Sequence, residues 1–121
     1  MPRIYETANR VRIHVGNYWK LYDEHPELFE EFRVHDVGRK GMSQRISAKI
    51  KDIGWVTYGW SFSKDQVRYD HDKKILYVFD KNALDIINKL KAQGEIKRVK
   101  LIKMIDKKGK KMKLPKEVAV V

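Results

Sequence analysis

Residues 41–55 read GMSQRISAKIKDIGW, and the periodicity of this stretch decides which fold class the sequence predicts. Apolar residues recur at three- and four-residue intervals, the spacing of one helix stripe: Met42, Ile46, Ile50 and Ile53. The opposite side is small and polar, and comprises Gln44, Ser47, Ala48 and Lys51. We therefore expect a helix over residues 42–53. Its polar face indicates either a binding surface or an ordinary surface helix, and the rest of the chain has to decide between them.

Length and composition favour a single intracellular domain. The chain has 121 residues, 42% of them hydrophobic, which is enough to bury a core, so we expect one domain over residues 1–121. There is no cysteine, which excludes disulfides, thiol nucleophiles and Cys-ligated zinc. No apolar run approaches the ~20 residues of a membrane-spanning helix, and the start, MPRIYETANR, has no signal-peptide core. We expect a cytoplasmic protein without membrane contact.

The net charge of +11 is unevenly distributed along the chain. Residues 21–36 contain six acidic residues and one basic residue, whereas residues 81–121 contain thirteen basic and four acidic residues. Segregation of this kind gives one face a positive potential and indicates a polyanionic partner. A lysine-rich chain without cysteine is also typical of thermophiles. That origin explains many lysines but not a surplus of eleven positive charges.

The remaining patterns predict an α+β fold. RVRIHV (10–15) alternates as a half-buried strand, and Asn17 is expected to cap a helical stretch over 18–33 that splits or kinks at Pro26. QVRY and ILYVF, joined by a charged tip, predict a hairpin over 66–79. Two further elements complete the chain: a helix over 83–93 capped by Asn82, and a basic β extension in which residues 96–105 form a strand.

The order of these elements resembles the small winged helix-turn-helix DNA-binding modules of phage, plasmid and archaeal mobile-element proteins. The motifs that carry the resemblance are ISAKIKDIGW (46–55) and QVRYDHDKKILYVF (66–79). The resemblance implies a winged-helix-like core over 18–80, followed by a helix and a basic β extension over 81–121. Helix 42–53 would be the recognition helix and hairpin 66–79 the wing. The implied function is non-catalytic binding of double-stranded DNA, as a regulator or an architectural protein.

Three groups of residues are the expected nucleic-acid contacts. The recognition helix and its entrance contribute Arg39, Lys40, Gln44, Arg45, Ser47, Ala48 and Lys51. The wing contributes Arg68, Lys73 and Lys74. The C-terminal extension contributes Lys97, Arg98, Lys100, Lys107, Lys108, Lys110 and Lys111. Small side chains on the helix would let its backbone approach base edges, and the cations would bind phosphates.

Other functions remain open on the sequence alone. Aromatic residues over 55–62, with the C-terminal lysines, could bind RNA or single strands by stacking; we expect Trp55 in the core, and Trp60 fits either a core or a stacking position. A protein–protein adaptor with a basic surface is another possibility, with residues 118–121 (VAVV) pairing as an edge strand in a homodimer. Duplex DNA is the favoured partner.

A metal-dependent nuclease is the one enzymatic alternative. Asp80, Glu95 and Lys97 resemble the D…ExK pattern in which two carboxylates hold Mg²⁺ and a lysine positions water. A whole helix separates the two parts of the pattern here, whereas that family runs from strand to strand. The histidines have no ligand-like spacing: His14, His25, His35 and His71. We expect no metal, no cofactor and no catalysis.

Overall fold

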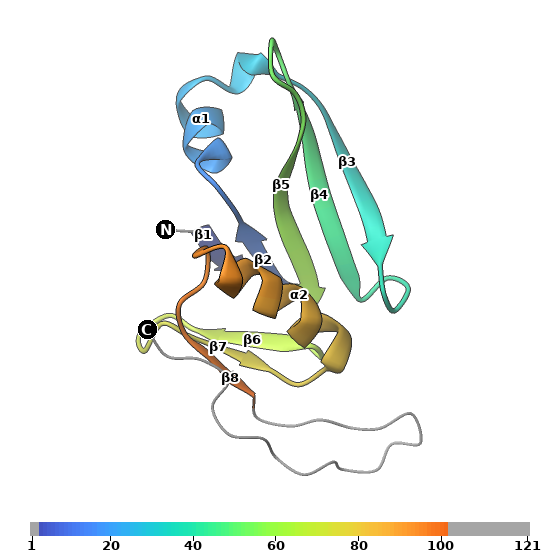
Figure 1. The fold of residues 1–121 in the computed structure, drawn as a ribbon, viewed down its shortest axis with the longest axis vertical. Helices are drawn as coiled ribbons and strands as arrows, with labels where there is room; N and C mark the ends of the chain where they lie inside the picture. The colour runs from blue at the N-terminus through green and yellow to red at the C-terminus, as the bar shows by residue number, and fades with distance from the viewer. Residues whose placement is uncertain (1–2, 102–121) are drawn as a thin grey trace.

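The computed structural model describes residues 3–101 and shows a mostly-β α+β fold without a helix-turn-helix arrangement (Figure 1). An antiparallel sheet has the strand order β1-β2-β5-β4-β3, formed by β1 (Arg3–Glu6), β2 (Arg10–His14), β3 (Phe29–Val37), β4 (Ser43–Ile50) and β5 (Gly54–Ser63). A smaller sheet has the order β6-β7-β8, formed by β6 (Val67–Asp70), β7 (Ile75–Val78) and β8 (Val99–Leu101). The helical elements are α1 (Tyr18–Glu24), the 3₁₀ turn η1 (Pro26–Leu28) and α2 (Lys81–Ala92). No helix within residues 3–101 is long and apolar enough to cross a membrane.

The prediction of a recognition helix over 42–53 is wrong, because this stretch forms β4 and a tight turn into β5. Ile46, Ala48 and Ile50 alternate at a period of two, so the stripe that fits a helix fits a strand face equally well. The turn places Asp52 and Gly54 in the left-handed region, at φ 65° and 94°. A glycine in this conformation ends a helix or closes a hairpin, and here it closes a hairpin.

The expected helical stretch over 18–33 is helical only in its first half. The chain divides at Pro26 as predicted, but residues from Phe29 onward form β3 instead of a second helix. The side chain of Asn17 does not cap α1; its carbonyl accepts the N–H groups of Lys20 and Leu21, both at 3.1 Å. The winged-helix fold is therefore excluded, because residues 42–53 form no helix and the stretch over 18–33 is helical only in part.

Three sequence predictions agree with the structure. The strand predicted over 10–15 is β2, the hairpin predicted over 66–79 is β6–β7, and the helix predicted over 83–93 is α2. The strand expected over 96–105 is present only as β8 within the described residues. The edge strand expected at 118–121 lies outside them.

The two helices cover opposite faces of the large sheet, in different halves. α2 and the small sheet pack on one face over a core that includes Val11, Ile13 and Phe62. α1 and η1 pack on the other face, against Ala48, Ile50 and Tyr58. Since α2 reaches only part of its face (Figure 1), the ends of β3, β4 and β5 that lie farthest from α2 are bare on that side.

A buried polar network joins the large sheet to α2. Gln66 is fully buried; its Nε2 lies 2.9 Å from Asp80 Oδ2, and its Oε1 accepts from the Ser43 hydroxyl at 3.1 Å. Asp80 Oδ2 also accepts the backbone N–H groups of Asn82 and Ala83, at 3.1 and 3.3 Å. Asp80, and not the expected Asn82, is therefore the N-cap of α2.

We predict that Gln66→Leu lowers the free energy of unfolding by about 2–4 kcal/mol, because the buried Ser43 hydroxyl and the half-buried Asp80 carboxylate each lose a partner. Urea unfolding followed by circular dichroism measures the change. The matched control is Gln44→Leu on β4, whose amide makes only an exposed 3.3 Å hydrogen bond to Asp36 and should change stability by less than about 0.5 kcal/mol. Equal losses in the two variants would contradict a structural role for the network.

Candidate nucleic-acid interface

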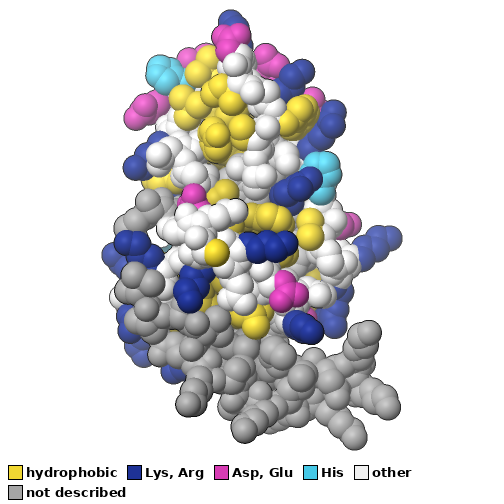
Figure 2. Space-filling model, viewed as in Figure 1, with side chains coloured by type: hydrophobic (Ala, Val, Ile, Leu, Met, Phe, Trp, Pro, Cys, Tyr) yellow, Lys and Arg dark blue, Asp and Glu magenta, His cyan; other side chains and the backbone are white. Residues whose placement is uncertain are grey.

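The bare face of β3, β4 and β5 carries a mixed aromatic and basic surface. Residues opposite each other in neighbouring antiparallel strands share a face. The register places Lys49 opposite Trp55, Ser47 opposite Arg33 and Thr57, and Arg45 opposite His35 and Trp60. We call this surface the platform; it comprises Arg33, His35, Arg45, Ser47, Lys49, Trp55, Thr57 and Trp60. Figure 2 shows basic side chains lying among hydrophobic ones over this part of the molecule.

Trp55 is the most accessible aromatic residue of the platform, with 42% of its surface exposed. The expectation that it lies in the core is wrong, because it stands on the α2 side of the large sheet but beyond the part that α2 covers. The Arg33 guanidinium lies 4.4 Å from the centroid of the indole ring, a cation–π distance. This contact restrains the ring while leaving much of its surface open to solvent.

The cations of the platform differ in how far they are already neutralised. Arg33 Nε lies 3.2 Å from Glu31 Oε1, and Lys49 Nζ lies 3.8 Å from Glu30 Oε2. Arg45 has no ion pair with any residue between positions 3 and 101. Arg45 is thus the platform cation that an anionic ligand can bind without displacing a carboxylate.

A groove continues the platform where α2 begins to cover the sheet. Trp60 is half-buried against the main core and lines the groove, which has a volume of about 470 Å³. Ile86 and Leu90 of α2 form part of its apolar wall, whereas Lys89 and Gln93 add polar groups. An apolar wall with a few polar groups is the usual lining of a small-ligand site, and a flat aromatic group fits this chemistry.

The structure separates the residues that the expected recognition helix would have brought together. Arg45 and Ser47 face the platform, but Gln44 and Ala48 face the opposite side, because side chains alternate along a strand. Ala48 is fully buried there, and Lys51 lies in the turn after β4. Arg39 and Lys40 lie in the β3–β4 turn, where Arg39 is 3.9 Å from Asp80.

Several platform residues were missed by sequence reasoning. Arg33, His35 and Lys49 were given no role in binding. Alternation in FRVHDV (32–37) and RISAKI (45–50) is the signal that places Arg33, His35, Arg45, Ser47 and Lys49 on one face. The helical period in the same residues obscures that signal.

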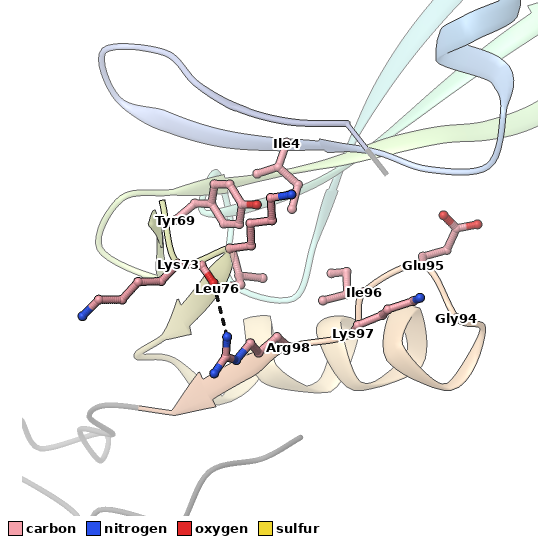
Figure 3. A pocket seen from close by; sticks show the side chains of 10 residues that line it. Ile4, Tyr69, Lys73, Leu76, Gly94, Glu95, Ile96, Lys97 and Arg98 are labelled. Atoms are coloured by element: carbon pink, nitrogen blue, oxygen red, sulfur yellow. Dashed lines mark hydrogen bonds between the residues drawn. The ribbon is translucent and has the colours of Figure 1, made fainter. Parts of the chain in front are cut away.

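A second basic region surrounds a cleft of about 540 Å³ between β1, the β6–β7 hairpin and the segment after α2 (Figure 3). It unites four expected contact residues from distant parts of the chain: Lys73, Lys74, Lys97 and Arg98. Arg98 Nη1 donates to the Lys73 carbonyl at 3.4 Å. Figure 3 shows Lys73 and Lys97 extending in different directions from an apolar floor that includes Leu76 and Ile96. These cations give the cleft a positive rim and do not converge on one anion position.

The other expected cations are dispersed or undescribed. Arg68 on β6 and Lys100 on β8 stand opposite Tyr77 on the same face of the small sheet. Arg68 Nε donates to the Lys64 carbonyl at 3.1 Å. Lys107, Lys108, Lys110 and Lys111 lie outside the described residues.

The residues of the nuclease hypothesis do not form a metal-binding arrangement in the described part of the chain. Asp80 is occupied as the cap of α2 and as the partner of Gln66, while Glu95 and Lys97 line the basic cleft. Between residues 3 and 101, no group of three or more His, Asp or Glu side chains is arranged to hold a metal ion.

His14 is the titratable group that burial perturbs most clearly. Burial, followed by the nearby Arg3 and Arg12 charges, lowers the pKa of His14 to about 4. Its Nε2 lies 3.0 Å from the Tyr5 hydroxyl, and its ring centroid lies 4.5 Å from that of Tyr58. Burial also raises the pKa of Tyr58 to about 12, with Tyr5 adding to the effect. These groups are neutral at neutral pH and lie away from the platform, so we assign them a structural role.

We predict that the neutral state of His14 makes folding sensitive to mild acid. Its pKa is lower in the folded state than the ordinary 6.5, so stability is complete above about pH 6.5 and is lost as the pH falls towards 4. Between pH 7 and pH 4.5 the wild type should lose about 2–3 kcal/mol more than His14→Gln, which cannot titrate there. Urea unfolding of both proteins at the two pH values measures the difference. Parallel losses in the two proteins would exclude His14 as the cause.

Comparison of the chain with protein-family models, with curated proteins and with solved structures found no match.

Proposed function

We propose that this protein binds single-stranded nucleic acid, RNA or DNA, across the platform, without catalysing a reaction on it. The observation that carries the proposal is the exposed Trp55, held against Arg33 on a sheet face that also presents Arg45 and Lys49. Aromatic side chains flanked by cations on an open sheet are the usual means of binding unpaired bases. The intracellular location expected of a chain without cysteine fits such a partner.

The two tryptophans of the platform offer separate positions for bases. They are five residues apart on β5, and the bulge opposite Ile46 and Ser47 shortens the separation to four strand rises, or roughly 13 Å. Successive bases in a stacked strand lie only about 3.4 Å apart, so the two rings would contact bases that are not neighbours in the strand. Thr57, between them on β5, is small and exposed, which leaves room for the strand to pass from Trp55 to Trp60 and the groove.

The phosphates would lie against cations on both sides of Trp60. Arg45 stands opposite Trp60 in the sheet, and Lys89 lines the same groove from α2. Lys49 stands opposite Trp55 in the same way. The net charge of +11 adds long-range attraction for any polyanion.

A single strand fits this surface better than the duplex that the resemblance implied. The major groove of DNA admits a helix or a two-stranded ribbon, and the expected recognition helix is a strand within a wider sheet. Stacking on Trp55 also requires a base with a free face, which paired and stacked duplex bases do not offer.

We predict that Trp55→Leu weakens binding of a single-stranded oligonucleotide by about 1–3 kcal/mol, because leucine keeps an apolar group but cannot stack. Trp55→Phe is the matched control and should retain most of the affinity. Fluorescence anisotropy with labelled single-stranded DNA, RNA and duplex of equal length measures both effects. Ile53→Ala in the adjacent turn, where the side chain is 57% exposed, should bind like the wild type. A wild type that binds no single strand at low salt would contradict the proposed function.

We predict that the double variant Arg45→Ala/Lys49→Ala binds with a smaller salt dependence. Each phosphate contact contributes about −0.7 to the slope of log K against log salt for a single strand, so losing two contacts reduces the slope by about 1.4. The control Lys20→Ala/Lys81→Ala removes the same charge from exposed positions on α1 and α2, away from the platform, and should keep the wild-type slope. Equal slopes in the two double variants would place the phosphates elsewhere on the protein.

A further inference from the structure

β3 is one of the two edge strands of the large sheet; β1 is the other. Among the described residues β3 pairs only with β4, and Figure 1 shows it as the outermost strand with no element beside it. The outer backbone N–H and C=O groups of such a strand form a template for another strand. Charged side chains commonly protect edges against pairing, so the arrangement of charges along β3 decides whether this edge is closed or open to a partner.

An aromatic cluster reaches this edge and remains exposed there. Phe32 packs against Phe29 and Tyr58, with ring centroids 5.8 and 5.5 Å apart, yet 44% of its surface is exposed. Val34, two residues along on the same face, is 59% exposed. The apolar layer beneath α1 therefore continues to the rim of the sheet and ends without a cover.

Two charged residues of β3 complement the same strand in a second copy. Glu31 and Arg33 lie on the platform side of β3, on either side of Phe32, and pair within the chain at 3.2 Å. Antiparallel pairing about Phe32 places Glu31 of each copy opposite Arg33 of the other, which gives two ion pairs. It also brings the two Phe32 rings together. Antiparallel pairing about Arg33 would instead oppose two guanidinium groups, which is unfavourable.

We propose that the protein forms a two-fold homodimer by antiparallel pairing of β3 with β3 of a second copy, with Phe32 opposite Phe32 and Glu31 opposite Arg33. A two-fold axis normal to the sheet makes the contact self-complementary and joins the two five-stranded sheets into one. Both platforms then lie on the same face of the joined sheet. The dimer rests on the edge alone and forms without nucleic acid, so its test is separate from that of the proposed function.

Charge reversal at the edge tests this dimer with the full chain in the absence of nucleic acid. Glu31→Arg and Arg33→Glu should each weaken self-association at least about tenfold, because both cross-strand pairs become repulsive. An equimolar mixture of the two variants should associate like the wild type, since each then supplies the opposite charge. Sedimentation velocity over a concentration series measures all of these. A monomeric wild type, a dimer that neither variant weakens, or a mixture that associates no better than its components would each overturn the proposal.

Three further variants control for net charge and for folding. Lys81→Glu makes the same change in net charge as Arg33→Glu, at an exposed position on α2, and should dimerise like the wild type. Thermal unfolding of each variant shows whether the fold is retained. If a charge variant does not fold, Phe32→Lys and Phe32→Asp take its place: each should fail to self-associate, and their mixture should restore the dimer. Failure of that mixture to associate would overturn the proposal in the same way.

Discussion

The buried amide of Gln66 fixes where α2 lies, and the exposed surface of the large sheet depends on that position. One side chain connects Ser43 at the start of β4 with Asp80 at the start of α2. A buried amide must satisfy its donors and acceptor, so the three groups have few alternative arrangements. With its N-terminus held at β4, α2 covers the sheet only as far as Trp60. The platform is the part of that face that remains beyond the helix.

Sequence periodicity predicted the elements whose apolar residues fit either the helical period or the strand period, but not both. RVRIH alternates without a competing helical stripe, and α2 has a helical stripe that does not alternate, so β2 and α2 were predictable. In 42–53 the apolar residues Ile46 and Ile50 satisfy both periods, and Gly54 suits both a helix end and a hairpin turn. Only the partner strands β3 and β5 decide between them, because their pairing with β4 supplies hydrogen bonds that a short isolated helix cannot match in stability.

The chemistry of the candidate site was more predictable than its geometry. Composition indicated a polyanionic partner, and Arg45, Trp60 and the cations of the hairpin tip were all considered for binding it. Their arrangement was predicted wrongly because the stretch was taken as a helix. In the strand that it forms, neighbouring side chains alternate, so Gln44 and Arg45 lie on opposite faces. Trp55 was assigned to the core on residue type alone. Its exposure follows from the end of α2, which is a property of tertiary structure that no local pattern contains.

The order of elements along the chain makes the two sheets unequal partners in folding. Every strand of the large sheet lies within residues 3–63, so all of its hydrogen-bonded pairings are available before any residue of the small sheet has been synthesised. The same segment ends with Val11, Ile13 and Phe62 uncovered, because their cover comes from α2 and the small sheet. A nascent chain of this length therefore contains every strand of the large sheet but lacks the elements that cover one of its faces. α2 and the small sheet therefore stabilise a strand order that residues 3–63 already define. A ribosome-bound intermediate would expose the apolar face of the large sheet until α2, including Leu90, has emerged.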